Sequence, residues 1–169
     1  GSRPTGIRAA ETPADDVAEY QPRWRSHTVD STQYRKVFLA GTIDMGRSAD
    51  WQAALVARFR DSIGGRWLFF NPRRREFHAS PAEMEYQVAW ELAHLEAADL
   101  IVMNLLGDSR SPISLLEMGL YARSGKLFVA CSPDYYRYDN VRITCRRYGV
   151  PLYDSLTALL DDLPQQSDE

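Results

Sequence analysis

The chain has 169 residues, of which 44% are hydrophobic and 25% charged, which fits one globular domain with a substantial core and excludes a disordered or fibrous protein. Its formal net charge of −3 provides no broad basic field, so a nucleic-acid polymer is not an expected partner. No apolar run has the length that spans a bilayer and no secretion signal is evident, so we expect no membrane association. The two cysteines do not form a disulfide framework, which favours a reduced, cytoplasmic setting.

The first part of the chain has a different character from the rest. Residues 1–33 carry Pro, Asp, Glu, Arg and Thr with little periodicity. Such a composition is typical of a flexible arm or of a segment that wraps the surface. We therefore expect an arm over residues 1–33 and an α/β domain over residues 34–165.

From Lys36 onward, short apolar runs alternate with segments of helical periodicity. The apolar runs predict five strands, at residues 36–41, 67–72, 99–106, 126–131 and 150–153. The other segments predict helices at about 50–62, 81–97, 111–124, 139–148 and 156–163. Strands rich in Val, Phe and Leu that alternate with helices are typical of a parallel sheet covered on both faces. The prediction is a doubly wound α/β domain with a five-stranded parallel sheet, which binds ligands at the carboxyl ends of its strands.

The loop that follows the first expected strand begins GTID, from Gly41 to Asp44. Glycine permits close approach of the backbone to a ligand, and a carboxylate such as Asp44 could hold sugar hydroxyls. The spacing matches neither the dinucleotide-binding fingerprint nor a P-loop. A plain strand-to-helix turn explains the glycines equally well.

The loop that follows the second expected strand begins with the turn signal Asn71-Pro72 and continues with Arg73, Arg74 and Arg75. The guanidinium group presents a fork of donors that suits phosphate or carboxylate recognition. For any one of these arginines, a solvated charge cluster is the simpler alternative. We take Asn71, Arg73 and Arg74 as candidate substrate-binding residues.

Two glutamates, Glu91 and Glu117, fall within or beside apolar helical stripes. The stripes are formed by Met84, Val88, Leu92 and Leu95 in the first of these helices and by Ile113, Leu116 and Leu120 in the second. A carboxyl group in such surroundings is paired, protonated or ready for a ligand. A structural ion pair with an arginine explains either glutamate taken singly. Taken together near the ligand end of the sheet, they resemble a tuned acid and nucleophile.

The loop that follows the third expected strand brings Asp108, Ser109 and Ser111 next to a helix N-terminus. Ser111 is most simply an N-cap, although its hydroxyl and the free amides behind it could also hold a phosphate or a ribose oxygen. The sequence contains no zinc-ligand spacing, no H-E-x-x-H motif and no G-x-S-x-G elbow. We therefore expect neither a metal nor a cofactor.

Five segments and their order along the chain carry a family resemblance: VFLAGTIDMGRSADWQ, LFFNPRR, EYQVAWELAHLEAADLIV, SPISLLEMGLYARSGK and DNVRITCRRYGV. Together they resemble the nucleoside 2-deoxyribosyltransferase family and its nucleotide N-glycosidase relatives, over roughly residues 36–154. The resemblance implies a doubly wound fold with flavodoxin-like strand order. It also implies a homo-oligomer, a dimer or larger, with sites near subunit contacts.

The resemblance assigns roles to individual residues. Glu117 matches the family nucleophile, and Glu91 matches an acidic residue that helps to hold the sugar, where the family often has aspartate. Ser111 lies six residues before the nucleophile, where nucleoside-specific members have a carboxylate, and serine there is similar to members that act on 5′-monophosphates. Gly41 and the segment from Thr42 to Asp44 match the loop that cradles the substrate.

The expected function is cleavage of an N-glycosidic bond, or (deoxy)ribosyl transfer, on a nucleoside or nucleoside 5′-monophosphate. The reaction would pass through a covalent glycosyl-glutamate, with a second base as acceptor in a transferase and water in a hydrolase. Two alternatives stay open at this point. The same loops could form a sensor that binds a nucleotide or nucleotide-sugar without turnover, or the protein could be structural, with both glutamates in ion pairs.

Overall fold

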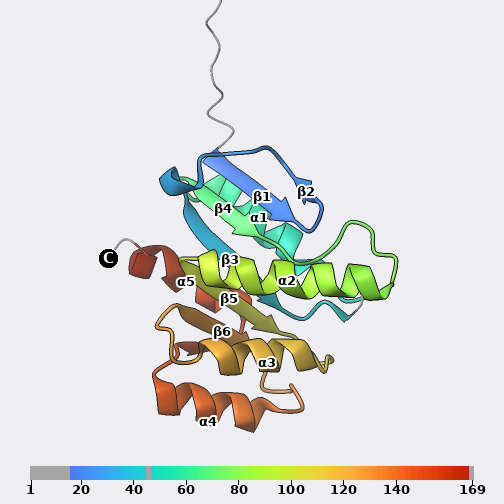
Figure 1. Ribbon diagram of the computed structural model, residues 1–169. Coiled ribbons are helices and arrows are strands. Elements are labelled where there is room, and N and C mark those ends of the chain that lie inside the picture. The colour runs from blue at the N-terminus through green and yellow to red at the C-terminus, as the bar shows by residue number, and fades with distance from the viewer. Residues whose placement is uncertain (1–15, 45–46, 168–169) are drawn as a thin grey trace, which may run out of the picture.

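A seven-stranded sheet forms the centre of the molecule in the computed structural model, which describes residues 16–44 and 47–167 (Figure 1). The strands are β1 (Val17–Gln21), β2 (Trp24–Arg25), β3 (Arg35–Gly41), β4 (Trp67–Phe70), β5 (Leu100–Leu105), β6 (Leu127–Cys131) and β7 (Leu152–Tyr153). Their spatial order is β2-β1-β4-β3-β5-β6-β7. Neighbouring strands are parallel except for β1 and β2, which form an antiparallel hairpin.

The five expected strands are present as β4-β3-β5-β6-β7, but the expectation of a five-stranded, wholly parallel sheet with flavodoxin-like order was incomplete. Two further strands extend the sheet beyond β4, and they come from the segment expected to form an arm. Val17, Ala18 and Tyr20 of β1 are buried in the core. A five-residue strand that is followed by proline is too short to produce a recognisable period, so the pattern missed it. Residues 1–15 of the expected arm lie outside the described residues.

Helices cover both faces of the sheet, as expected (Figure 1). They are α1 (Trp51–Ser62), α2 (Pro81–Ala97), α3 (Pro112–Tyr121), α4 (Tyr138–Tyr148) and α5 (Leu156–Ser167). One core cluster packs α2, α3 and α4 on one face, and a second packs α1 and α5 on the other. Local signals set the helix starts: the side chains of Asp50 and Ser80 accept hydrogen bonds from the first turns of α1 and α2.

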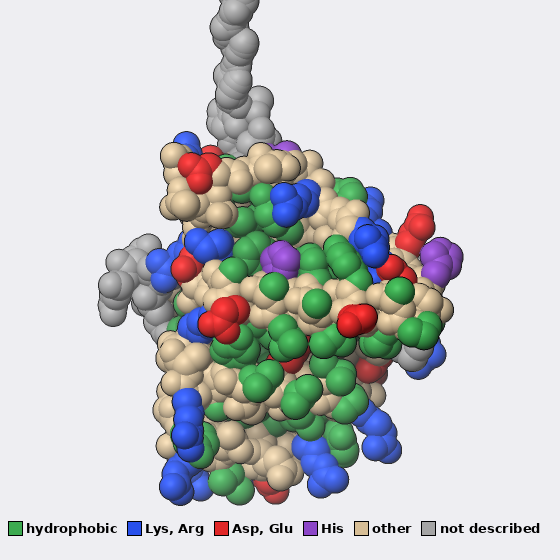
Figure 2. Space-filling model, viewed as in Figure 1, with side chains coloured by type: hydrophobic (Ala, Val, Ile, Leu, Met, Phe, Trp, Pro, Cys, Tyr) green, Lys and Arg blue, Asp and Glu red, His purple; other side chains and the backbone are tan. Residues whose placement is uncertain are grey.

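The apolar stripes of α2 and α3 lie largely at the surface. Leu95 is buried, but the other six side chains are 45–61% exposed and form one surface, which we call the apolar face: Met84, Val88, Leu92, Ile113, Leu116 and Leu120. Figure 2 shows these two helices covered by hydrophobic side chains. Other residues of the helices, including Trp90 and Met118, pack on the sheet instead. Periodicity detects an apolar stripe but does not say what the stripe contacts.

The loops that follow β3, β4 and β5 lie at one edge of the sheet, because parallel strands end on the same side. α2 and α3 start at that edge and lie next to each other on one face (Figure 1). This arrangement brings the candidate loops and both candidate glutamates to one region. No helix among the described residues is long and apolar enough to cross a bilayer.

Candidate active site

The side chains of Glu91 and Glu117 meet between α2 and α3 and are hydrogen-bonded to each other. Glu117 is only 7% exposed, and Glu91 is partly buried. Neither carboxyl forms an ion pair with any Lys or Arg that the structure describes. The interpretation of these glutamates as structural ion pairs is therefore wrong within the described residues, and we call the two groups the carboxyl pair.

The surroundings of the carboxyl pair favour the protonated state. Burial raises the pKa of Glu117 to about 8, and the neighbouring charge of Glu91 and the hydrogen bond between them act in the same direction. Burial also raises the pKa of Glu91, while a hydrogen bond from Gln87 Nε2 at 2.7 Å opposes that rise. Two interacting carboxyls titrate as a unit, so a proton on one of them favours ionisation of the other.

The raised pKa of Glu117 predicts a pH-dependent stability. Between the ordinary carboxyl pKa of 4.5 and the folded value of about 8, the folded protein retains a proton that the unfolded chain loses. The free energy of unfolding should therefore fall as the pH rises through this window, by at most roughly 1.4 kcal/mol per pH unit from this group. Glu117→Gln should reduce the slope and be more stable than the wild type at pH 8. Urea unfolding at pH 5 to 8 measures the free energy of unfolding of both proteins. An equal dependence on pH in both would contradict the prediction.

Three hydroxyl groups form a buried cluster where β3 and β5 end. Thr42 Oγ1 lies 2.9 Å from Ser109 Oγ and 2.9 Å from Ser111 Oγ, and the two serine oxygens are 3.0 Å apart. Thr42 Oγ1 also accepts a hydrogen bond from the amide of Leu106 at 3.0 Å. The hydroxyl cluster thus joins the end of β3 to the loop that precedes α3.

Ser111 occupies the N-cap position of α3, but the expectation that its side chain caps the helix was wrong. Its backbone is left-handed, with φ 48°, and its hydroxyl makes no capping hydrogen bond. The first-turn amides of α3 therefore lack a side-chain partner from Ser111. A helix N-terminus in this condition can receive an anion.

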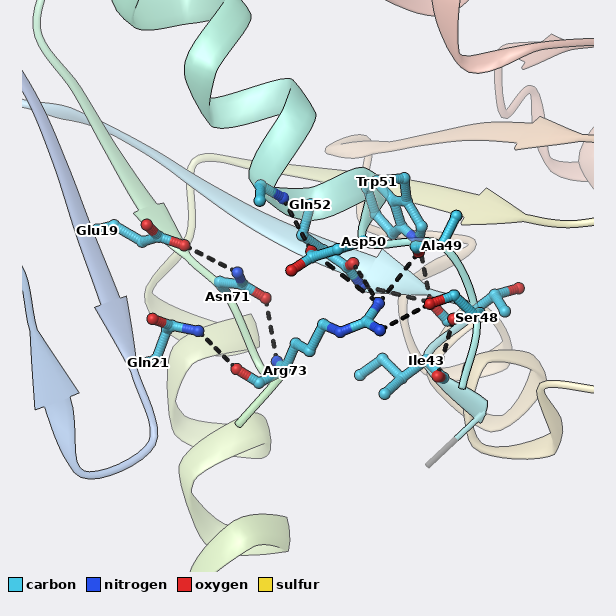
Figure 3. Close-up of polar contacts among 12 residues, drawn as sticks. Glu19, Gln21, Ile43, Ser48, Ala49, Asp50, Trp51, Gln52, Asn71 and Arg73 are labelled. Carbon is cyan, nitrogen blue, oxygen red and sulfur yellow. Dashed lines mark hydrogen bonds and ion pairs between the residues drawn. The ribbon is translucent and has the colours of Figure 1, made fainter. Parts of the chain in front are cut away.

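Arg73 holds the loop that precedes α1 (Figure 3). Its guanidinium donates to the carbonyl oxygens of Ser48 at 2.7 Å and Ala49 at 3.1 Å, and to Gln52 Oε1 at 3.2 Å. Asn71, directly after β4, supports it: its Oδ1 accepts from the amide of Arg73 at 3.0 Å. The polar groups of both candidates thus contact protein, and their role in substrate binding stays a prediction.

Arg74 is also engaged with protein, and its side chain is only 9% exposed. It donates to Glu83 Oε1 at 2.5 Å, to Gln87 Oε1 at 3.3 Å and to the carbonyl of Glu76 at 3.0 Å. The alternative of a solvated charge cluster therefore does not describe Arg73 or Arg74. It does describe Arg75, which is exposed.

Asp44 and Asp108 come together in a cavity of about 260 Å³ at the ends of β3 and β5, with Arg47 and Leu106 in its lining. Gly41 lies below this loop at φ 121°, and a Cβ there would meet the carbonyl oxygen of Asn104 at 2.1 Å. The glycine is required by the close approach of two strands, whatever the loop binds. The structure thus places Asp44 and Asp108 in the lining of one cavity. It also explains why a glycine is needed at position 41.

A model of the family described as nucleoside 2-deoxyribosyltransferase like matches residues 34–135, more than half of the chain. The chain belongs to this family. The match contains the carboxyl pair and the hydroxyl cluster, whereas β1, β2, α4, β7 and α5 of this nucleoside 2-deoxyribosyltransferase-like protein lie outside it. No curated protein sequence matches the chain significantly.

Gln87 of this family member contacts the site but was not predicted from the sequence. It lies one helical turn before Glu91 and donates to it, and the spacing of four residues on a helix could have indicated this. Ser109, which was expected next to the N-terminus of α3, lies in the hydroxyl cluster, and only the fold reveals its contact with Thr42. Among the described residues, no group of three or more His, Cys, Asp or Glu side chains is placed to hold a metal ion.

Proposed function

We propose that the protein cleaves the N-glycosidic bond of a nucleoside or nucleoside 5′-monophosphate, or transfers its (deoxy)ribosyl group, through a glycosyl ester on Glu117. The observation that carries the proposal is the carboxyl pair. The pair consists of two carboxyl groups from neighbouring helices that are hydrogen-bonded to each other. Neither group has a basic partner among the described residues. A structural carboxylate would normally have a cationic partner, whereas a shared proton between two carboxyls suits an acid and a nucleophile.

The first step uses the single proton of the pair. As the sugar enters between the two carboxyls, the proton passes from Glu117 to Glu91, and a Glu117 carboxylate oxygen attacks the anomeric carbon. The bond from the anomeric carbon to the base breaks, its electron pair goes to the base nitrogen, and Glu91 delivers the proton there. Negative charge beside the ring stabilises the transition state, which resembles an oxocarbenium ion.

The second step restores the pair. An incoming base or a water molecule gives a proton to Glu91 as it attacks the anomeric carbon. The ester bond breaks and its electrons return to Glu117, which leaves one proton on two carboxyls again. The acceptor decides between transferase and hydrolase, and exclusion of water from the site would favour transfer.

The N-terminus of α3 supports the 5′-monophosphate among the possible substrates. Its first-turn amides lack a cap from Ser111, and an anion there would interact favourably with the helix dipole. The ratio of kcat/KM for a nucleoside 5′-monophosphate to that for its nucleoside measures this preference. A ratio of one or less would contradict a phosphate subsite.

The experiment that tests the reaction is incubation with a mixed pool of nucleosides and 5′-monophosphates, with freed bases measured by mass spectrometry. The expected result is release of at least one base, together with protein whose intact mass is increased by one sugar residue. Saturable binding without any free base would overturn the proposal in favour of a nucleotide sensor.

We also propose that the protein forms a homo-oligomer through the apolar face. Six large apolar side chains that are 45–61% exposed, on two adjacent helices, exceed the scattered exposure usual for a monomer. A two-fold axis would place the face of one copy on the same face of the other, which is the commonest arrangement of homodimers. Because the carboxyl pair lies between the same two helices, association would further restrict its contact with water.

Leu116→Lys should convert the oligomer into a monomer, because it would place a charge within the buried interface. The leucine is 61% exposed in one chain, so the fold itself should tolerate lysine. Ala57→Lys, an exposed position on α1 at the opposite face of the sheet, is the matched control and should leave the oligomer intact. Sedimentation velocity measures the state, and a monomeric wild type would refute the interface.

A further inference from the structure

A second cavity, of about 470 Å³, lies where the β1–β2 hairpin meets the Arg-rich loop and the first turn of α2. Its lining consists of Pro22, Arg23, Trp24, Arg74, Arg75, Glu76, His78 and Glu83. Pro22, Arg23 and Trp24 precede the residues that match the family, so this cavity is partly built from a segment outside that match. Its volume is within the range of small-molecule sites.

The lining of this cavity contains three arginines and two glutamates, so its formal charge, with His78 neutral, is positive by one unit. Glu83 receives hydrogen bonds from both Arg23 at 2.7 Å and Arg74 at 2.5 Å, and these hold the pKa of Glu83 at about 2. Arg75 makes no ion pair with a carboxylate among the described residues, and its guanidinium lies 4.3 Å from the ring centroid of Trp24. An arginine held by stacking keeps its fork of donors available for an anion.

The hairpin wall of the cavity is fixed in an unusual conformation. Arg23 has a φ of 62°, which a residue with a Cβ rarely adopts. Its amide donates to Tyr86 Oη at 3.1 Å, and its guanidinium lies 4.0 Å from the Tyr86 ring centroid. Both the backbone and the side chain of Arg23 therefore hold the β1–β2 turn against α2. Backbone strain that is maintained by such contacts is found at ligand sites.

Hydrogen bonds connect the cavity to the carboxyl pair. Glu83, Gln87 and Glu91 recur every four residues along one side of α2. Arg74 donates to Glu83 and Gln87, and Gln87 donates to Glu91 at 2.7 Å. Movement of Arg74 toward an anion would therefore disturb the partner of Glu91.

We propose that this cavity binds a small phosphomonoester, with Arg75 as its principal contact, at a site separate from the carboxyl pair. An arginine stacked on a tryptophan in the lining of a concave cavity matches the shape and charge of a phosphate group. The proposal goes beyond the glycosidic reaction, because it concerns a second ligand and holds whether or not the carboxyl pair is catalytic.

The test is calorimetric titration of the full chain with ribose 5-phosphate, with ribose as the neutral counterpart. The wild type should bind the phosphomonoester and not ribose. Arg75→Glu should weaken that binding by at least about tenfold, since a charge-assisted contact becomes repulsion. Arg146→Glu, an exposed arginine on α4, is the matched charge-reversal control and should leave it unchanged.

The outcomes separate this site from the reaction centre. Base release from neutral nucleosides should be unchanged in Arg75→Glu, because Arg75 takes no part in the carboxyl pair. Equal affinity in Arg75→Glu and the wild type would overturn the proposal, as would an absence of binding in the wild type. A loss of affinity in Ser111→Ala with none in Arg75→Glu would place the phosphate at α3 and also overturn it.

Discussion

Glu117→Gln should reduce base release by at least about 10³-fold while the protein stays folded, because an amide cannot form the glycosyl ester. The amide has almost the same volume as the carboxyl and can still hydrogen-bond to Glu91, so the packing between α2 and α3 is kept. Chromatography of the freed base measures the rate, and circular dichroism measures whether the protein is folded. Together they separate a loss of chemistry from a loss of structure. Glu117→Ala should show the same loss, and full activity in either variant would refute the assignment.

The matched control for Glu117 is Glu85→Gln, which removes an exposed carboxyl from α2 and should leave the rate unchanged. Glu91→Gln should cost about 10²–10⁴-fold, as expected for loss of a proton-transfer group. Lost activity in Glu117→Gln is the result that the proposed role predicts. It should be accompanied by increased stability at pH 8, where burial of the charged form of Glu117 is costly.

Gly41→Ala should destabilise the fold by more than about 4 kcal/mol or prevent folding. The added Cβ would lie 2.1 Å from the carbonyl oxygen and 2.6 Å from the amide nitrogen of Asn104, which are backbone atoms of the adjacent strand. β3 and β5 would have to separate at the point where the candidate loops begin. Thermal unfolding, or the yield of soluble protein, measures the effect.

Gly149→Ala controls for backbone conformation alone. Gly149 also has a positive φ, 69°, but a Cβ there would meet nothing within 4 Å. Its substitution should cost only about 1 kcal/mol, from the left-handed backbone. A melting temperature of Gly41→Ala close to that of Gly149→Ala would show that the two strands can separate at little cost.

Sequence reasoning was accurate where a signal is local and repeated. The long apolar runs that became β3 and β5 leave no alternative to buried strands, and Ser80-Pro81 marked the start of α2 where the structure has it. The oddness of Glu91 and Glu117 was also visible, because a carboxyl among leucines departs from the helical pattern. Their hydrogen bond to each other was not visible, since it depends on how two helices pack.

Contacts that only the fold creates could not be predicted from the sequence. The charge of Arg73 indicates what its side chain can bind, but not that its guanidinium donates to the carbonyl oxygens of Ser48 and Ala49. The apolar stripes that contain Leu92 and Leu116 are visible in the sequence, but the exposure of these leucines is not. Composition reports the chemistry that a side chain can perform, while its partner is set by tertiary packing.

The hydroxyl cluster has fewer available hydrogen atoms than oxygen–oxygen contacts. Ser109 Oγ donates to the carbonyl oxygen of Leu106 at 2.8 Å, so its hydrogen is not available within the triangle. Thr42 and Ser111 then contribute two hydrogens to three oxygen–oxygen contacts, and one contact has none at any moment. The triangle can exchange between arrangements by rotating hydroxyls while its heavy atoms stay in place, so this junction can adapt to a donor or an acceptor without moving the strands.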